Sequence, residues 1–236
     1  RPDPGPGDVL VEVHAASVNP IDWKIREGYM KSFVDIPMPH VMGRDVSGVV
    51  FAVGDGVESL AAGDAVYGSA TANRDGTHAE YVAIPAAMLA RKPKRIDHVE
   101  AASLPISALS AYAGLVTHGN LAAGEKVLIH AGAGGVGVIA IQLAKHIGAT
   151  VATTASAYNA EYVRELGADI AIDYRMTDFA AAAGEYDLVF DTMGGEVHLR
   201  SYAVLASGGR MTYLNADPIP EEKPRDDVTV LNAPVA

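Results

Sequence analysis

The sequence KVLIHAGAGGVGVIAIQLAKHIG, at residues 126–148, decides the fold. An apolar run at 127–129 has the composition of a short buried strand. Glycines follow in the pattern G-x-G-x-x-G at residues 132–137. Apolar residues then recur at the three- and four-residue spacing of one helical face up to Ile147, and Gly148 is suited to end the helix. This order predicts a strand, a tight turn and a helix.

The same order predicts an anion site. The N-terminus of a helix offers backbone N–H groups and about half a positive charge, and glycine lets a pyrophosphate approach the backbone. The glycine pattern alone is weak, because tight turns often contain glycine, but the strand before it and the helix after it supply the required context. We therefore predict a dinucleotide-binding turn, and the alternative is a glycine turn with a purely structural role.

The composition argues against several classes of protein. The chain of 236 residues has a net charge of −11 and no run of Lys or Arg, so nucleic acid is not expected as a partner. No apolar stretch reaches membrane-spanning length, so no membrane association is expected. Cysteine is absent, which excludes disulfides and thiolate zinc sites and makes a cytoplasmic location the simplest expectation.

The first part of the chain has the pattern of a β-rich domain. Short runs with strand composition are separated by turns that contain glycine, and residues 17–28 combine an Asn-Pro turn with a short helical stretch. Frequent short strands of this kind predict a small barrel or a sandwich-like domain. The expected strands are 8–14, 46–53, 65–67 and 79–84.

From about residue 96 the pattern changes to alternating strands and helices. Asp97 and Glu100 fit a capping box, and Pro105 is placed to open the next helix. The alternation predicts an α/β fold with a doubly wound parallel sheet. Strand 186–191 lacks polar alternation, so we expect it to be buried on both faces. The expected strands are 126–131, 149–154, 170–173, 186–191 and 210–214, and the expected helices are 136–147, 158–166 and 194–205.

The second strand of this sheet bears on which dinucleotide binds. An NAD site usually has Asp or Glu at the end of this strand, where the carboxylate binds the ribose 2′-hydroxyl. Residues 149–156 contain no acidic residue, which favours NADP(H), since a carboxylate would repel a 2′-phosphate. Ser156 and Tyr174 could hydrogen-bond that phosphate and Arg175 could add charge; alternatively, all three are ordinary loop residues.

A series of ordered motifs runs along the whole chain. Besides the glycine turn, they are SVNPIDWKIREG (17–28), GRDVSGVVFAVGDGV (43–57), AAGDAVYG (61–68), GTHAEYVAIP (76–85), LPISALSAYAGL (104–115), LGADIAIDY (166–174), YDLVFDTMGG (186–195) and GGRM (208–211). Together they resemble the zinc-free quinone oxidoreductase, or zeta-crystallin-like, branch of the medium-chain dehydrogenase/reductase family. The resemblance implies a GroES-like catalytic domain at 1–103 and a Rossmann NADP-binding domain at 104–236.

The resemblance also implies which residues serve the cofactor and the substrate. Asn19 is expected near the nicotinamide, and Lys24 stands where many relatives have a tyrosine that touches cofactor or substrate, although a solvated helix lysine is the alternative. Asn159 stands where some relatives have a lysine for the 2′-phosphate, which weakens the expected preference for NADP. The expected cofactor-binding residues are Ala133, Gly134, Gly135 and Val136 at the pyrophosphate, Ser156 and Tyr174 at the adenosine phosphate, and Asn215 beside the nicotinamide.

The resemblance implies an oxidoreductase that transfers hydride from NADPH to a quinone or an α,β-unsaturated carbonyl. Zinc relatives bind metal with Cys and His, and by motif those places hold Asn19, Arg44 and Ile106, so no metal is expected. Asn19, Lys24 or backbone N–H groups would stabilise the developing oxyanion, and water or Lys24 would supply the proton. The alternative is a catalytically weak structural protein that binds NADPH, as crystallins of this family do.

The resemblance bears on assembly and completeness as well. Relatives are dimers, so we expect a homodimer, and residues 227–231 resemble the strand at the dimer edge. Relatives normally begin with a further strand pair and return after the Rossmann domain to complete the catalytic domain. We therefore expect this chain to be truncated at both ends, which would leave strand edges unpaired in the first domain.

Overall fold

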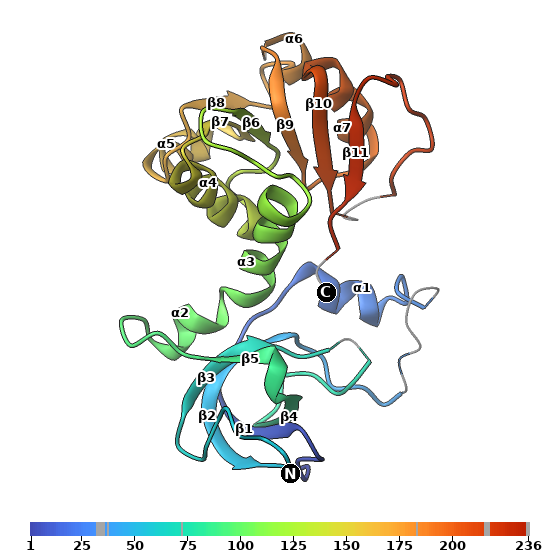
Figure 1. Cartoon of the computed structure of the whole chain (residues 1–236). Helices are drawn as coiled ribbons and strands as arrows, with labels where there is room; N and C mark the ends of the chain where they lie inside the picture. The colour runs from blue at the N-terminus through green and yellow to red at the C-terminus, as the bar shows by residue number, and fades with distance from the viewer. Residues whose placement is uncertain (32–35, 37, 72, 183, 215–217, 235–236) are drawn as a thin grey trace. The chain divides into compact units, whose positions relative to one another are not determined.

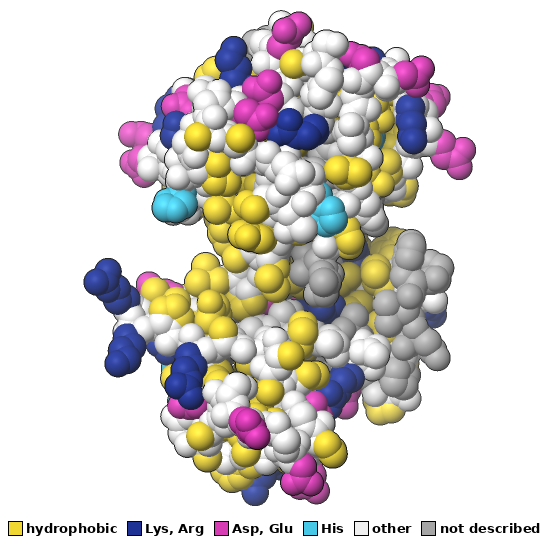
Figure 2. All heavy atoms as spheres, in the orientation of Figure 1, with side chains coloured by type: hydrophobic (Ala, Val, Ile, Leu, Met, Phe, Trp, Pro, Cys, Tyr) yellow, Lys and Arg dark blue, Asp and Glu magenta, His cyan; other side chains and the backbone are white. Residues whose placement is uncertain are grey.

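The chain forms two compact units, Arg1–Ile106 and Ser107–Ala236, in a computed structural model. The structure describes residues 1–31, 36, 38–71, 73–182, 184–214 and 218–234. Each unit has its own β-sheet (Figure 1) and its own apolar core. On the face drawn in Figure 2, acidic and basic side chains of the second unit are interspersed.

The first unit is built on one antiparallel sheet. Its strands are β1 (Asp8–Ala16), β2 (Asp45–Val53), β3 (Ala65–Ser69), β4 (Tyr81–Pro85) and β5 (Leu89–Arg91), in the order β4-β1-β2-β3-β5. Inward-facing residues of these strands form a core that includes Val9, Val11, Val46, Val66 and Ile84. Among the described residues the sheet is open, with edges at β4 and β5, so this β-rich unit has the unpaired strand edges that the sequence predicts.

Two short helices of this unit begin where local sequence signals place them. Helix α1 (Pro20–Arg26) has Pro20 in its first turn, and the Asp22 carboxylate accepts the Asn19 N–H at 2.7 Å. Before helix α2 (His98–Ala102), Asp97 and Glu100 form the predicted capping box, with bonds of 2.8 and 2.9 Å. Each helix is therefore fixed by side chains close to it in sequence.

The second unit is built on a six-stranded parallel sheet in the order β11-β10-β9-β6-β7-β8. The strands are β6 (Lys126–Ile129), β7 (Thr150–Ala155), β8 (Ile170–Asp173), β9 (Tyr186–Asp191), β10 (Leu205–Tyr213) and β11 (Thr229–Asn232). The first strand in sequence, β6, lies in the middle, and successive strands run outwards from it in both directions. This is the predicted doubly wound arrangement, and its order reverses between β6 and β9.

The helices of this part of the chain are α3 (Pro105–Tyr112), which continues as a π-helical turn (Ala113–Thr117), α4 (Gly135–Ile147), α5 (Ala160–Glu165), α6 (Phe179–Ala182) and α7 (Gly195–Ser201). Short 3-10 turns occupy Ala157–Asn159 and Tyr202–Val204. Helix α4 ends at Gly148, whose φ of 98° is left-handed, as the sequence predicts. Helix α6 and strand β5 were not predicted, because both are only a few residues long.

One boundary differs clearly from its prediction. The helix expected at about 194–205 is α7 followed directly by the 3-10 turn Tyr202–Val204, whereas β10 begins at Leu205 instead of at residue 210. Leu205 pairs with Tyr186 of β9, and an irregularity then separates this pair from Arg210 and Leu188. The sequence between Leu205 and Arg210, Ala-Ser-Gly-Gly, has the composition of a turn, which hides the early start of the strand.

Burial explains why the apolar residues of the second unit lack alternation. Leu188, Val189 and Phe190 of β9 are fully buried, which confirms that this strand is covered on both faces.

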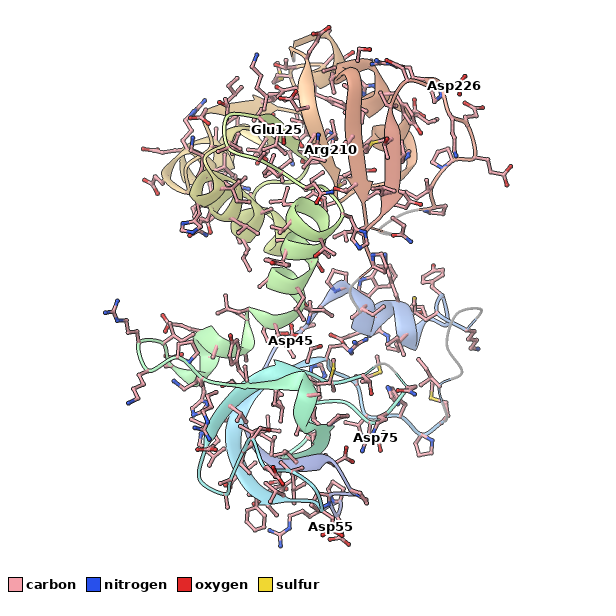
Figure 3. All side chains as sticks on the ribbon, in the orientation of Figure 1. Asp45, Asp55, Asp75, Glu125, Arg210 and Asp226 are labelled. Atoms are coloured by element: carbon pink, nitrogen blue, oxygen red, sulfur yellow. The ribbon has the colours of Figure 1, made fainter. Side chains whose placement is uncertain are left out.

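Arg210 of β10 donates to the Gly119 carbonyl and the Glu125 carboxylate, both at 2.7 Å, which ties the segment before β6 to the sheet (Figure 3).

Candidate dinucleotide-binding site

Two glycines of the G-x-G-x-x-G motif are required by packing. A Cβ atom on Gly132 would lie 2.0 Å from the Thr153 Oγ1. On Gly137 it would lie 2.3 Å from the Ala131 carbonyl oxygen. Both glycines are buried, so a side chain at either position would displace backbone or core atoms. Their role is to bring the turn, β7 and α4 into close contact.

The other two glycines face solvent at the start of α4. Gly134 is the N-cap and accepts the first helical bond, from the Val138 N–H at 3.0 Å, and Gly135 follows it. The first turn of a helix leaves its N–H groups without helical acceptors, and α4 has no acidic residue there to offset the positive end of the dipole. The start of α4 thus has the exposed backbone and the positive dipole end that the predicted pyrophosphate site requires.

Ala133 and Val136 were predicted to face the same pyrophosphate. Both are half-buried, and both side chains pack against the main core of the second unit. At the surface these two residues therefore present their backbone rather than their side chains, and backbone N–H groups are what an anion would bind.

The turn is held by a threonine on the neighbouring strand. Ala131 has a φ of 53°, in the left-handed region that is unfavourable for residues other than glycine. Its N–H donates to the Thr154 Oγ1 at 3.0 Å, and the Gly132 N–H donates to the Thr154 carbonyl at 2.9 Å. The Ala131 carbonyl in turn accepts the Gly134 N–H at 2.9 Å.

A buried histidine lies behind this turn. The His130 ring contacts the Thr154 hydroxyl through Nδ1 at 3.2 Å and the Ser201 hydroxyl through Nε2 at 2.9 Å. Burial lowers the pKa of His130 from 6.5 to about 4, so its ring is neutral at neutral pH. Neither His130 nor its partners were predicted as site residues. The available signal was a histidine directly between the strand and the glycines.

The carboxyl end of β9 lies next to that of β6, at the point where the strand order reverses. Asp191 accepts N–H bonds from Met193 and Gly194 at 2.8 and 3.0 Å and a bond from the buried His198 ring at 2.9 Å. Burial acts to raise the pKa of Asp191, but the bonds from His198 and the two N–H groups lower it below its ordinary value. Ligands of open α/β sheets bind beside such reversal points.

Ser156 and Tyr174 are brought together at the same edge of the sheet. Ala155 lies opposite Asp173 in the β7–β8 pair, so the residues that follow each strand are neighbours. Tyr174 is 55% exposed, and the Arg175 guanidinium lies 5.7 Å from its ring centre. The Asp173 carboxylate accepts the Arg175 N–H at 3.1 Å. This edge therefore offers hydroxyls and an arginine close to one carboxylate.

Asn215, predicted to flank the nicotinamide, lies outside the described residues.

In the first unit, Asn19 belongs to a polar cluster with Ser17 and Asp45 (Figure 3 labels Asp45). Asn19 Nδ2 donates to the Ser17 hydroxyl at 2.8 Å and to an Asp45 oxygen at 2.9 Å, and Ser17 donates to that same oxygen at 2.8 Å. The other Asp45 oxygen accepts the Ile106 N–H at 3.0 Å. Both amide protons of Asn19 are thus used, so toward a ligand its side chain can act only as an acceptor, through Oδ1, which also faces the Asp22 N–H in the capping box of α1.

Arg44 and Ile106, predicted at former metal-ligand places, lie beside this cluster. Burial raises the pKa of Asp45, although its hydrogen bonds and the neighbouring Arg44 charge oppose that change. Burial lowers the pKa of Arg44, opposed by Asp45 and Asp22. In the part of the chain that the structure describes, no three His, Cys, Asp or Glu side chains gather in a way that could hold a metal ion.

Lys24 lies on α1, one turn after Pro20. Its side chain is half-buried, and its ammonium lies 5.8 Å from the centre of the Trp23 ring. Asn19 and Lys24 thus belong to one short segment of the first unit, whereas the glycine turn belongs to the second unit.

Both units match known protein families. Residues 5–94 match the alcohol dehydrogenase GroES-like domain, and residues 135–234 match the zinc-binding dehydrogenase family. Among the described residues, no helix is long and apolar enough to cross a membrane.

Individual relatives cover nearly all of the chain. The NADPH-dependent alkenal/one oxidoreductase of Arabidopsis thaliana, a chloroplastic protein, is 44% identical over 214 residues, which are 87% of this chain and 54% of that protein. The chain thus spans about half the length of the curated relatives it matches.

Solved structures resemble this chain in both sequence and fold. The quinone oxidoreductase of Coxiella burnetii is 34% identical, with a TM-score of 0.88 over 100% of this chain and 76% of its own. A mycobacterial protein solved in complex with NADPH is 32% identical, with a TM-score of 0.88 over 99% of this chain and 75% of its own. With these matches to sequence and structure, the chain belongs to the quinone oxidoreductase branch of the medium-chain dehydrogenase/reductase family.

Proposed function

We propose that the protein is an NADPH-dependent reductase that transfers hydride to a quinone or to the β-carbon of an α,β-unsaturated carbonyl. The observation that carries this proposal is the start of α4. There the backbone of Gly134 and Gly135 is exposed, and no acidic side chain in the first turn offsets the positive end of the helix dipole. The relatives named as an alkenal/one oxidoreductase and a quinone oxidoreductase support this substrate class.

NADP(H) is the proposed cofactor. Bound there, it would supply the hydride, and the protein would supply its position and electrostatic environment. Ser156, Tyr174 and Arg175 would meet the 2′-phosphate at the ends of β7 and β8. The mycobacterial structure in complex with NADPH supports this choice.

The proposed roles of Asn19 and Lys24 differ in kind. Both amide protons of Asn19 already donate within the first unit, so we assign its Oδ1 an acceptor role, for example toward the carboxamide N–H of the nicotinamide. Lys24 is then the side chain proposed to donate to the developing oxyanion and to supply its proton. The proposed mechanism needs no metal, because the Lys24 cation and hydrogen-bond donors would stabilise the oxyanion in place of a metal Lewis acid.

Steady-state kinetics with the purified protein test these roles. We expect NADPH oxidation to depend on added quinone or enone, and Lys24→Met to lower kcat by at least about tenfold, the effect of losing an oxyanion donor. Lys24→Arg, which keeps the charge, is the matched control and should retain more activity. Equal rates for all three proteins would remove Lys24 from the chemistry, and NADPH binding without turnover of either substrate class would remove the reductase.

The alternative, a structural protein that binds NADPH without turnover, is not favoured, since the relatives are named for reductase activities. A homodimer and a cytoplasmic location remain our proposals. The edge position of β11 is compatible with pairing between copies, which the molar mass in solution would test. The chloroplastic relative makes cell fractionation the test of location.

A further inference from the structure

The cluster of His130, Thr154 and Ser201 links three elements behind the glycine turn. His130 follows β6, Thr154 lies on β7 and Ser201 ends α7. All three side chains are buried, with exposures of 1%, 5% and 0%. The cluster ends at the Ala131 N–H on one side and at the Val197 carbonyl on the other.

The direction of every hydrogen bond in this cluster follows from proton counting. The Ser201 hydroxyl donates to the Val197 carbonyl at 2.7 Å, so toward His130 its oxygen accepts a bond from Nε2–H. A neutral imidazole with its proton on Nε2 has an acceptor at Nδ1. The Thr154 oxygen accepts the Ala131 N–H, and its own proton is then available for Nδ1. One tautomer of His130 satisfies every group.

This arrangement bears directly on the shape of the turn. The left-handed Ala131 is unfavourable by itself, and the Thr154 hydroxyl holds its N–H in place. The Ala131 carbonyl both accepts the Gly134 N–H and lies against Gly137, so its orientation sets how the start of α4 is presented. We infer that Thr154 and His130 are positioning residues that hold the turn in the shape required by the dinucleotide pyrophosphate, an inference that rests on the proposed function.

Affinity for NADPH, measured together with thermal stability, tests this role. We expect Thr154→Val to raise the Kd for NADPH by about tenfold or more, and Thr154→Ser, which keeps the hydroxyl, to restore a Kd near that of the wild type. The matched control is Thr212→Val. Thr212 is also buried on a strand of this sheet and donates one bond, at 2.9 Å, to the Gly114 carbonyl.

The control separates positioning from general stability. Thr212→Val should lower Tm by a similar amount while changing the Kd less than about twofold. If Thr154→Val and Thr212→Val change the Kd equally, or if Thr154→Val leaves it unchanged, the positioning role is wrong. If the wild-type protein itself fails to bind NADPH, the proposed cofactor is wrong instead, so the two failures are distinguishable.

The tautomer provides a second readout, which does not depend on NADPH. Nitrogen-15 NMR of the wild-type protein at neutral pH should show His130 with a protonated Nε2 and an unprotonated Nδ1. In Thr154→Val the Nδ1 resonance should move, because its hydrogen-bond donor is gone. A wild-type His130 protonated on Nδ1 would overturn the hydrogen-bond directions assigned to the cluster. An Nδ1 resonance that stays unchanged in Thr154→Val would overturn them as well.

Discussion

The four glycines near the start of α4 have two different tasks. Gly132 and Gly137 are buried where a Cβ atom would overlap Thr153 or Ala131, whereas Gly134 and Gly135 are exposed. Packing and ligand access are thus assigned to separate residues of one motif. Substitution by alanine should separate the two tasks.

We expect Gly137→Ala to lower the free energy of unfolding by about 1–3 kcal/mol and to weaken NADPH binding, because its Cβ would lie 2.3 Å from the Ala131 carbonyl. Gly134→Ala has its nearest atom at 3.2 Å and a φ of −81°, so it should change stability by less than about 1 kcal/mol while still impeding the pyrophosphate. Denaturant unfolding and NADPH titration of both variants check this. Equal stability losses would contradict the division of tasks.

His130 should make stability depend on pH. Its folded pKa of about 4 is below the ordinary 6.5, so between these values the unfolded chain binds more protons than the folded one. The contribution of a neutral His130 is therefore complete above pH 6.5 and is lost as the pH falls toward 4, by about 3 kcal/mol in all.

Denaturant unfolding at several pH values measures this loss against His130→Gln, which cannot titrate. The difference in stability between the two proteins should shrink as the pH falls through this window. Parallel pH profiles would show that His130 is not the group responsible.

The backbone turn could be predicted from the sequence, whereas the side chains that support it could not. The glycine turn and its neighbours are contiguous, so their spacing carries the information. His130, Thr154 and Ser201 were missed, because their contacts join positions 24 and 71 residues apart. The acceptor role proposed for Asn19 likewise depends on Asp45, which lies 26 residues away.

At the scale of elements, helix α4 was predicted well because its signals are local. Its apolar face, its glycine start and its Gly148 end all lie within one segment. The start of β10 was placed too late, because Leu205 joins the strand by pairing with Tyr186, which no local pattern reveals. Local chemistry therefore fixed the helix ends, and tertiary pairing fixed the strand.

The end of α4 provides a stability prediction. Gly148 has a φ of 98°, so Gly148→Ala should lower the free energy of unfolding by about 1 kcal/mol or more. Gly184→Ala is the matched control, since a Cβ atom there meets nothing within 4 Å. Denaturant unfolding compares the two variants. A stability loss confined to Gly184→Ala would contradict the role of Gly148 as the helix end.

At the scale of the whole molecule, sequence predicted the division into a β-rich part and a doubly wound part, because hydrophobic periodicity changes between them. Sequence also predicted unpaired strand edges in the first part, and the described sheet has them at β4 and β5. Which strands are neighbours depends on pairing, which strand composition does not reveal. The order β8-β7-β6-β9-β10-β11 places β6 and β9 together, which brings Asp191 to the edge where the glycine turn lies.

In the proposed function, NADPH binds through the backbone at the start of α4. Hydrogen exchange measured by mass spectrometry, with and without saturating NADPH, tests it most directly. We predict that NADPH slows exchange most strongly in peptides covering residues 131–138, which include the N–H groups of the first turn of α4 that have no helical acceptor. Unchanged exchange in these peptides, with protection appearing elsewhere or nowhere, would contradict the account.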